Sequence, residues 1–200
     1  VAVELSPVIV GQTGEQTFII RNSGTADLVV SSIISTNLHY TVNPTTVNLL
    51  PGSEQLITVV FTPTEFGLEQ GSLSITHNAI GSPSITVQGI GKPSTGTVVV
   101  DHISSDTTWT KSGNPYFIPQ NILINQGLTL TMEAGVEVCF ATDTYLKAEG
   151  KLIAIGTNED PILFTSANST PSAGDWQGIQ IRSTGGTSFD TNQVYVSGSK

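Results

Sequence analysis

Short apolar segments recur at a nearly constant interval in the second half of the chain, and Gly, Asn, Asp or Pro separates almost every pair. Equivalent residues return after about 22 to 26 positions, for example from Leu130 to Leu152 and from Val138 to Ile162. The segments are Ile122–Ile124, Leu128–Leu130, Val136–Val138, Leu146–Ala148, Leu152–Ala154, Ile162–Phe164 and Ile179–Ile181. A repeat of this length predicts one coil of a solenoid rather than one strand of a sandwich.

The first half has a different rhythm, with longer strands in which apolar and polar residues alternate. The clearest of about seven predicted strands are Thr17–Asn22, Leu28–Ile34, Gln55–Phe61, Gly71–Thr76 and Ser84–Gly89. Strands at this spacing favour an Ig-like β-sandwich. Helix signals are almost absent, so the whole chain is predicted to be all-β. The predicted boundaries are a sandwich at residues 1–91, a Pro-containing linker at 92–97 and a second domain at 98–200.

Several ordered motifs of the first half carry a family resemblance. They are Asn22–Leu28, Leu50–Ser53, Val60–Gly67, Gly71–Ile75 and Val87–Gly91. Together they resemble the hydin-type (ASH) Ig-like domain, of which similar modules occur in bacterial secreted and surface proteins. The resemblance implies a spacer, scaffold or interaction module. No catalytic residue belongs to the motifs, so none is carried over.

The second half carries another resemblance, over about Thr107 to Arg182. Its motifs are Asp106–Thr110, Gly113–Ile118, Gln126–Leu130, Glu133–Val138, Glu149–Gly156, Asp160–Ser166 and Gly174–Ile179. This series is similar to the entry coils of a right-handed parallel β-helix of the pectate-lyase-like type. The resemblance implies about three coils, in which Leu130 stacks on Leu152 and Val138 on Ile162 or its neighbours. Sharp turns are expected at Ala134–Gly135 and Glu149–Gly150.

Composition narrows the function classes. The net charge is −9 with only seven basic residues, which argues against nucleic acid, because nucleic acid needs a Lys/Arg footprint. No apolar run approaches the length of a membrane span, so no membrane insertion is expected. Val1–Leu5 lacks a signal-peptide pattern. Only 12% of residues are charged, and Thr, Ser and Asn take their place, a composition that predicts an extracellular or cell-surface protein.

No cofactor or metal site is predicted. The histidines His39, His77 and His102 show no metal-ligand spacing with one another or with Cys139. Cys139 is expected to be a buried, inert thiol, although strand alternation leaves it on either face. The acidic segment Thr157–Asp160 lacks the regular oxygen-ligand series of a calcium loop and is interpreted as a turn between coils.

No catalytic residue is predicted either. Asp175 precedes Trp176, but no partner carboxylate at a suitable spacing is found. Weaker candidates are Asp101, Asp106 and Asp143, and the few basic residues of this half are Lys111, Lys147, Lys151, Arg182 and Lys200. Aromatic residues that could stack on sugars are scattered: Trp109, Tyr116, Phe117, Tyr145, Trp176 and Tyr195. Trp109 and Trp176 are interpreted as core or cap residues.

The sequence therefore predicts a non-enzymatic extracellular structural module. Its β-helix is expected to end in an unpaired edge at Val194, Tyr195 and Val196. Such an edge can pair with further coils or with a neighbouring subunit, giving a homo-oligomer or a filament. Two alternatives stay open: the N-terminal part of a polysaccharide-active β-helix enzyme, and a glycan-binding adhesin.

Overall fold

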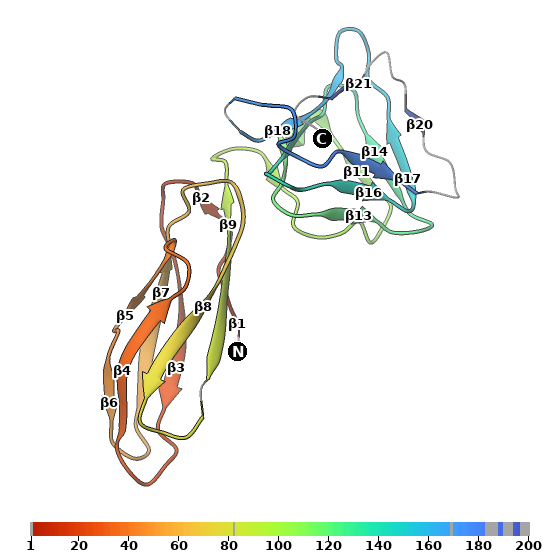
Figure 1. Ribbon diagram of the computed structural model, residues 1–200. Helices are drawn as coiled ribbons and strands as arrows, with labels where there is room; N and C mark the ends of the chain where they lie inside the picture. Colours follow the sequence, from red (N-terminus) through yellow and green to blue (C-terminus); the bar gives the residue numbers. More distant parts are fainter. Residues whose placement is uncertain (1, 82, 169, 183–187, 190–193, 197–200) are drawn as a thin grey trace. The chain divides into compact units, whose positions relative to one another are not determined.

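The computed structural model describes residues 2–81, 83–168, 170–182, 188–189 and 194–196 (Figure 1). Among these residues one short 3-10 helix, η1 (Lys111–Gly113), interrupts an arrangement made otherwise of strands and loops. The all-β prediction is confirmed. The chain divides into two compact units, Val1–Gly91 and Lys92–Lys200. No helix of the described part has the length and apolar character needed to cross a membrane.

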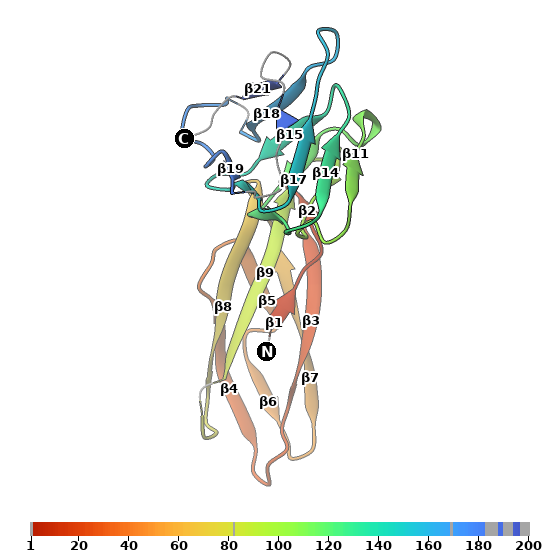
Figure 2. The same cartoon turned by 90° about the vertical axis from the view of Figure 1, so that its right-hand side faces the viewer.

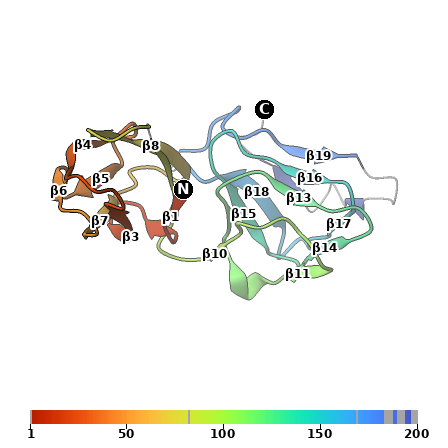
Figure 3. The same cartoon turned by 90° about the horizontal axis from the view of Figure 1, so that it is seen from below.

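The first unit contains two sheets that face each other across one core. Its strands are β1 (Ala2–Glu4), β2 (Val8–Ile9), β3 (Gly14–Arg21), β4 (Leu28–Ser35), β5 (Tyr40–Asn43), β6 (Val47–Leu49), β7 (Glu54–Phe61), β8 (Gly67–His77) and β9 (Ser84–Lys92). One sheet has the order β1-β9-β8-β4-β6, and β2 also pairs with β9. The other has the order β3-β7-β5. Figure 3 shows β4 and β8 in one layer and β3 and β7 in the other.

Alternation along the strands produces the core of this unit. In β7, Ile57, Val59 and Phe61 are fully buried while their neighbours are more exposed. Successive side chains of a strand point to opposite faces, so an apolar residue at every second position gives the sheet one buried face. Phe61 stacks on Tyr40, with ring centroids 4.7 Å apart.

The second unit contains three sheets, and every strand pairs in parallel with its neighbours. The sheets have the orders β10-β12-β15-β18-β21, β13-β16-β19 and β11-β14-β17-β20. The strands are β10 (Thr97–Val98), β11 (Thr107–Trp109), β12 (Tyr116–Ile118), β13 (Ile122–Ile124), β14 (Thr129–Met132), β15 (Glu137–Phe140), β16 (Leu146–Ala148), β17 (Lys151–Ala154), β18 (Ile162–Ser166), β19 (Ile179–Ile181), β20 (Ser188–Phe189) and β21 (Val194–Val196).

The chain visits these three sheets in a fixed cyclic order. Each of the rounds β12–β14, β15–β17 and β18–β20 places one strand in each sheet. An entry round comes first, in which Ile103 forms a single bridge to Ile124 in place of a strand. Figure 2 shows β11, β14 and β17 side by side, as their parallel pairing requires. A cyclic order of this kind makes each round cover the previous one.

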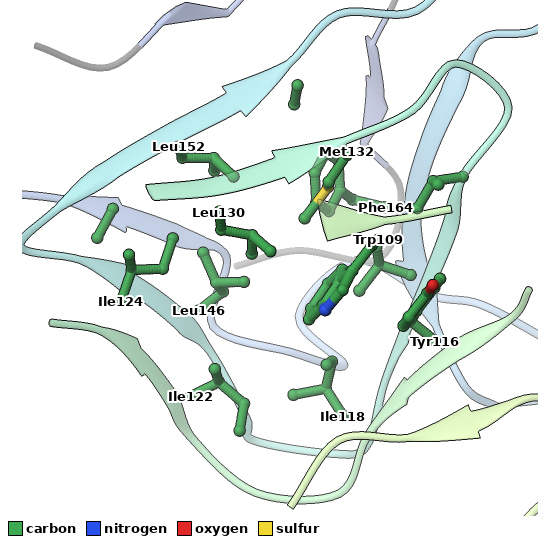
Figure 4. Packing of buried hydrophobic residues seen from close by; sticks show 14 of the residues in the cluster. Trp109, Tyr116, Ile118, Ile122, Ile124, Leu130, Met132, Leu146, Leu152 and Phe164 are labelled. Atoms are coloured by element: carbon green, nitrogen blue, oxygen red, sulfur yellow. The ribbon is translucent and has the colours of Figure 1, made fainter. Parts of the chain in front are cut away.

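Residues in register form apolar columns inside this unit (Figure 4). Leu130 lies beside Leu152, as the 22-residue repeat predicted. Val138 was expected on Ile162 or one of its neighbours, and it is in register with Phe164, two residues further along β18. The backbone explains the shift: the N–H of Leu163 donates to the carbonyl of Val136, 2.9 Å away, so Ile162 lies beside Val136 instead.

Gly150 is required at the turn between β16 and β17. A Cβ atom there would lie 2.3 Å from the carbonyl oxygen of Leu128 and 2.4 Å from that of Asn125. Its own N–H donates to the carbonyl of Ile124, 3.0 Å away. This turn passes directly over the preceding round, so only a residue without a side chain fits.

The segment predicted as a linker is short. Lys92 is still the last residue of β9, and Thr97 is already the first residue of β10. The N–H of Thr97 donates to the carbonyl of Pro115, 2.9 Å away, which fixes β10 beside β12. Residues 93–96 are therefore the part of this segment that lies outside strands.

Candidate interaction surface

The entry side of the second unit is covered by an aromatic pair. Trp109, at the end of β11, stacks on Tyr116 of β12 with ring centroids 4.7 Å apart, and both side chains are buried. The hydroxyl of Tyr116 accepts the N–H of Thr110 at 2.8 Å and donates to its carbonyl at 3.2 Å. The predicted core or cap position of Trp109 is confirmed, because its ring lies over the first round and is 4% exposed.

Polar side chains of the first rounds bind the backbone of the next round. Each accepts the backbone N–H of a residue about one round later. The pairs are Asp106 Oδ1 with Thr129 at 2.8 Å, Asn114 Oδ1 with Glu137 at 2.9 Å, Asn121 Oδ1 with Tyr145 at 3.1 Å and His102 Nδ1 with Leu123 at 3.3 Å. These side chains hold the starts of successive strands in register.

Backbone carbonyls take this role one round later. Thr129 and Lys151 are in register, and the N–H of Lys151 donates to the carbonyl of Leu128 at 2.8 Å. Leu163, in register with Glu137, donates likewise to the carbonyl of Val136. The entry rounds are therefore chemically distinct from the rounds that follow. Sequence reasoning had considered Asp106 only as a weak candidate carboxylate, and the one available signal was its position just before a strand.

The far side of this unit ends in the strands β19, β20 and β21, one in each sheet. β21 contains the predicted interaction residues Val194, Tyr195 and Val196, which pair with Ile162, Leu163 and Phe164 of β18. Among the described residues, no further strand pairs with the outer edge of any of the three. The side chains of Val194–Val196 lie outside the described part, so the structure places their backbone alone.

One inward column shows what the end of the stack does to the core. Ile124, Ala148 and Ile181 are in register on β13, β16 and β19. Ile124 and Ala148 are fully buried, whereas Ile181 is 48% exposed. The three residues occupy the same position in successive rounds. Ile181 differs because no described residue covers it as Ile181 covers Ala148.

The histidines lie in three separate settings. The Nε2 of His39 is 3.1 Å from Thr64 Oγ1 and its Nδ1 is 3.3 Å from Glu69 Oε1. His77 Nδ1 accepts the N–H of Ala79 at 3.1 Å, and His102 binds the backbone as described above. In the part of the chain that the structure describes, no three His, Cys, Asp or Glu side chains converge as a metal ion would require.

Cys139 is not buried as predicted. It is half-buried on the outward face of β15, because the two neighbours at alternate positions, Val138 and Phe140, occupy the core. The Sγ donates weakly to Glu137 Oε1 at 3.5 Å. Partial burial and the Glu137 carboxylate raise the pKa of the thiol to about 12, so the thiolate is scarce at neutral pH.

The acidic candidates are used in turns. Asp160 forms an ion pair with Lys111, and its N–H donates to Thr157 Oγ1 at 3.0 Å. Asp175 Oδ2 accepts the N–H of Ser172 at 2.9 Å. That bond, with side-chain bonds from Ser166 and Asn168, holds the pKa of Asp175 below its ordinary value.

The remaining candidates do not form a cluster around these turns. Asp101 is exposed, and Asp143 has a positive φ of 61° and donates its N–H to the Asp175 carbonyl. Lys147 forms an ion pair with Glu149 in the turn that follows β16, and Arg182 donates its backbone N–H to the carbonyl of Ala148. Lys151 lies at the start of β17. Lys200 lies outside the described residues.

The aromatic residues serve mainly the core. Trp176 is fully buried and stacks on Phe140, with ring centroids 4.0 Å apart and planes 6° apart, which confirms its predicted core position. Phe140 also contacts Phe164 one round later, with centroids 6.5 Å apart. Tyr116 and Phe117 are buried as well, and Tyr145 is half-buried. The side chain of Tyr195 is outside the described part.

Two family models match the chain, one for each unit. The first, described as "Abnormal spindle-like microcephaly-assoc'd, ASPM-SPD-2-Hydin" (ASH), matches residues 1–85. The second, described as a pectate-lyase like beta helix domain, matches residues 101–197. Both families are those that the sequence motifs resembled, so the two-part identification is confirmed. A search of curated proteins found no match.

Solved structures share a weaker likeness with this chain. The ASH/PapD-like domain 7 of human CEP192 has 14% identity and a TM-score of 0.43, over 46% of this chain and 82% of that domain. SSP-19, an MSP-domain protein like family member of Caenorhabditis elegans, has 13% identity and a TM-score of 0.34, over 44% of this chain and 94% of SSP-19. A chain of the CsuC-CsuE chaperone–tip adhesion subunit complex of Acinetobacter baumannii has 13% identity and a TM-score of 0.35, over 44% of this chain and 54% of that chain.

Proposed function

We propose, from the premise that the chain joins an ASH domain to a pectate-lyase-like β-helix domain, that it is a non-enzymatic structural module of the cell exterior. In this proposal the three parallel sheets form a right-handed parallel β-helix of about three coils. The ASH domain acts as a spacer or interaction module. The β-helix acts as a stiff rod, and its terminal edge is completed by further coils or by a neighbouring copy of the chain.

The observation that carries the proposal is the column Ile124, Ala148 and Ile181. An apolar side chain at an inward position of the last described layer is half exposed, while its equivalents below are fully buried. Among the residues that the structure describes, no strand pairs with the outer edges of β19, β20 and β21 beside this apolar surface. A solenoid end of this kind needs either a cap or another repeat, since each layer buries the one before it.

The use of the polar groups supports a structural role over catalysis. Asp106, Asp160 and Asp175 each bind backbone N–H groups or a lysine within turns. Catalytic carboxylates of glycoside hydrolases work in pairs that flank the scissile bond. Here Asp106 instead binds the backbone of the next round, Asp160 pairs with Lys111, and Asp175 holds the turn at Ser172.

Sedimentation velocity of the 200-residue polypeptide over a hundredfold concentration range tests the proposal. We expect concentration-dependent association through the exposed end. Ile181→Lys should reduce it, because a lysine there charges the apolar surface. Ile155→Lys is the matched control, since Ile155 is 51% exposed, close to the 48% of Ile181, but does not belong to the inward column.

Association that is absent at every concentration, or that both variants reduce equally, would contradict stacking at this end. The intact mass of the native polypeptide then separates the two ways of completing the edge. A mass and C-terminal sequence that continue beyond Lys200 indicate further coils, and a chain that ends at Lys200 indicates a neighbouring copy. Labelling of the chain on intact producing cells with a membrane-impermeant reagent tests the proposed location.

A further inference from the structure

Three polar side chains of the first unit form a continuous series where the chain passes from β7 to β8. The Oγ1 of Thr64 is 3.1 Å from the Nε2 of His39, and the Nδ1 of His39 is 3.3 Å from the Oε1 of Glu69. His39 belongs to the loop between β4 and β5, Thr64 to the loop between β7 and β8, and Glu69 to β8. A hydroxyl, an imidazole and a carboxylate therefore meet from three separate segments of the chain.

Burial differs along this series. The side chains of His39 and Glu69 are 24% and 23% exposed, and the Nδ1 atom of His39 is buried. Thr64, in contrast, is an exposed residue. The imidazole and the carboxylate are thus largely shielded from water, while the hydroxyl at the end of the series is open to a reactant.

The carboxylate of Glu69 decides which nitrogen of His39 carries the proton. Nδ1 faces Oε1 at the distance of an ion pair, without the alignment of a hydrogen bond, and no other described group satisfies this nitrogen. A carboxylate beside Nδ1 favours a proton on Nδ1, and the other nitrogen is then an acceptor. Nε2 therefore accepts the hydroxyl proton of Thr64, as a general base does from its nucleophile. Poorly aligned contacts of such a series tighten when a reactant binds.

Asn37 and Tyr40 hold the histidine and the carboxylate in place. The Nδ2 of Asn37 donates to the second oxygen of Glu69, Oε2, at 2.9 Å, and its Oδ1 accepts the N–H of His39 at 2.9 Å. The hydroxyl of Tyr40 donates to the backbone carbonyl of Glu69 at 2.8 Å. Side chains that are fixed by further hydrogen bonds keep the geometry that a reaction needs.

Backbone N–H groups lie next to the hydroxyl. In the described part of the chain, neither the N–H of Thr64 nor that of Glu65 is bonded to an acceptor. N–H groups beside a nucleophile can stabilise the oxygen anion that forms when a carbonyl is attacked. Thr62, in the same loop, differs: its N–H donates to the carbonyl of His39 at 2.8 Å, and no described side chain bonds its hydroxyl.

We propose that Thr64 is an activated hydroxyl that accepts an acyl group from an acyl ester with a good leaving group. Its Oγ1 attacks the carbonyl carbon while Nε2 of His39 takes the proton. The tetrahedral intermediate then expels the alcohol, which receives that proton, and an ester of Thr64 remains. Glu69 is a positioning residue, because it orients the imidazole and stabilises its protonated form. The transfer happens once per chain, so Thr64 is a modification site, and the chain needs no enzymatic turnover.

The test treats the full 200-residue chain with p-nitrophenyl acetate at pH 7.5, and peptide mass spectrometry of quenched samples gives the rate of acetylation at each threonine. Thr64 should be acetylated about a hundredfold faster than Thr62, because a positioned general base contributes at least that factor. Thr62 is the matched comparison, as it is equally classed as exposed and lies in the same loop. Neutral hydroxylamine should remove the acetyl group, since it cleaves esters and leaves the amides of acetylated lysines intact.

Variants separate an activated hydroxyl from a purely structural bond. His39→Asn should lower the rate at Thr64 about a hundredfold. Glu69→Gln should lower it at least about tenfold, because an amide that donates to Nδ1 moves the imidazole proton to Nε2. Glu69→Asp keeps the charge and should retain more of the rate than Glu69→Gln. Thr62→Val should leave the rate at Thr64 unchanged. Circular dichroism melting identifies any variant that fails to fold.

Three results would overturn the proposal. The first needs no variant: acetylation of Thr64 at the rate of Thr62 would show an ordinary hydroxyl bonded to a structural histidine. The second is an unchanged rate at Thr64 in a folded Glu69→Gln chain. The third is release of more than one equivalent of p-nitrophenolate that Thr64→Val abolishes, because the hydroxyl then turns over as that of an esterase does.

Discussion

In the first unit, β8 pairs antiparallel with β4 and with β9. Two sheets, each with its own set of strands, face each other across one core. In the second unit, strands pair in parallel with the strands one round before and after, and each round repeats the path of the last. Each strand of the sandwich therefore has its own pairing partners, and no pairing pattern repeats along the chain. In the stack of rounds each round covers the one before it, so the pairing pattern is the same from one round to the next.

This difference explains where each unit exposes apolar side chains. The sandwich leaves an apolar hollow at one edge of its two sheets, lined by Phe18, Ile20 and Ile75 among others. The stack leaves its last layer, where Ile181 lies in the same column as the buried Ala148. The apolar surface of the first unit is a local hollow at one edge, and that of the second unit is a whole layer. The following predictions test this comparison, from the largest effect to the smallest.

Deleting the ring of Phe140 should cost most, because it lies between Trp176 and Phe164 in the middle of the stack. We expect Phe140→Ala to lower the free energy of unfolding by about 3–5 kcal/mol. Ile181→Ala, in the last layer, should cost less than about 1 kcal/mol, since half of the side chain is exposed. Both tryptophans belong to the second unit, so tryptophan fluorescence in a urea titration reports this unit. Equal costs at the two positions would show that the layers do not differ as their burial suggests.

Gly150→Ala should destabilise the second unit by about 3 kcal/mol, because its methyl group overlaps two carbonyl oxygens of the preceding round. Gly127→Ala is the matched comparison. It has a φ of +81° and no atom near the added Cβ, so it carries only the backbone cost of about 1–2 kcal/mol. Thermal unfolding of the two variants measures the difference. A larger loss for Gly127→Ala would mean that the rounds are not in close contact at Gly150.

Asp106→Ala should cost about 1–2 kcal/mol, because the N–H of Thr129 loses its acceptor. Asp106→Asn keeps an acceptor oxygen and should recover most of the loss. Urea midpoints of both variants, followed by tryptophan fluorescence, check this. If alanine and asparagine behave alike, the side chain does not hold the second round in register.

Acid should remove the contribution of Asp175. Its pKa is lower in the folded chain than in the unfolded one, mainly because the N–H of Ser172 binds the carboxylate. The contribution is therefore present above the unfolded pKa of about 3.9 and disappears as the pH falls through the folded pKa. Urea midpoints of the wild type and Asp175→Asn, measured between pH 6 and pH 2.5, should differ at the upper end and converge at the lower end. Parallel curves over this range would contradict the assignment.

The rate of alkylation of Cys139 tests the environment of its thiol, where the smallest effect on stability is expected. With a pKa of about 12, the folded thiol should react with iodoacetamide at pH 8 at least about a hundredfold more slowly than in urea. Mass spectrometry of quenched samples gives both rates. Glu137→Gln should speed the folded reaction, since the carboxylate next to the thiol is one cause of the raised pKa. Equal rates in the folded and unfolded chain would contradict it.

Much of the architecture could be predicted from local pattern. The stacking of Leu130 on Leu152 follows from the repeat length, and the buried positions of Trp109 and Trp176 follow from their place among the turns. The exact partner of Val138 was left open between Ile162 and its neighbours, because the three turns between β15 and β18 differ in length and periodicity alone does not say which is longest. Cys139 was expected to be buried with its face left open, because alternation without a register leaves the two faces of a strand equivalent, and the structure places it half-buried on the outward face.

The candidate site was predicted only in outline. An unpaired edge at Val194–Val196 was expected, but the exposed column ending in Ile181 depends on pairing between residues more than thirty positions apart. The binding of the Thr129 N–H by Asp106 was not predicted, because its acceptor and donor belong to different rounds. Asn22 in the first unit is similar: it is 5% exposed, and its side-chain amide donates to the carbonyls of Ala26 and Leu49.

By itself the sequence determined the two-part organisation, the all-β class and the repeat that stacks one round on another, since alternation, turn residues and spacing are local properties of the chain. The tertiary structure alone decided which residue lies beside which across the rounds, which core side chains of the sandwich stay partly exposed at its edge, and that Ile181 is exposed. Burial is set by the segment that covers a side chain, and in this fold that segment lies a whole round away or in another strand of the sandwich.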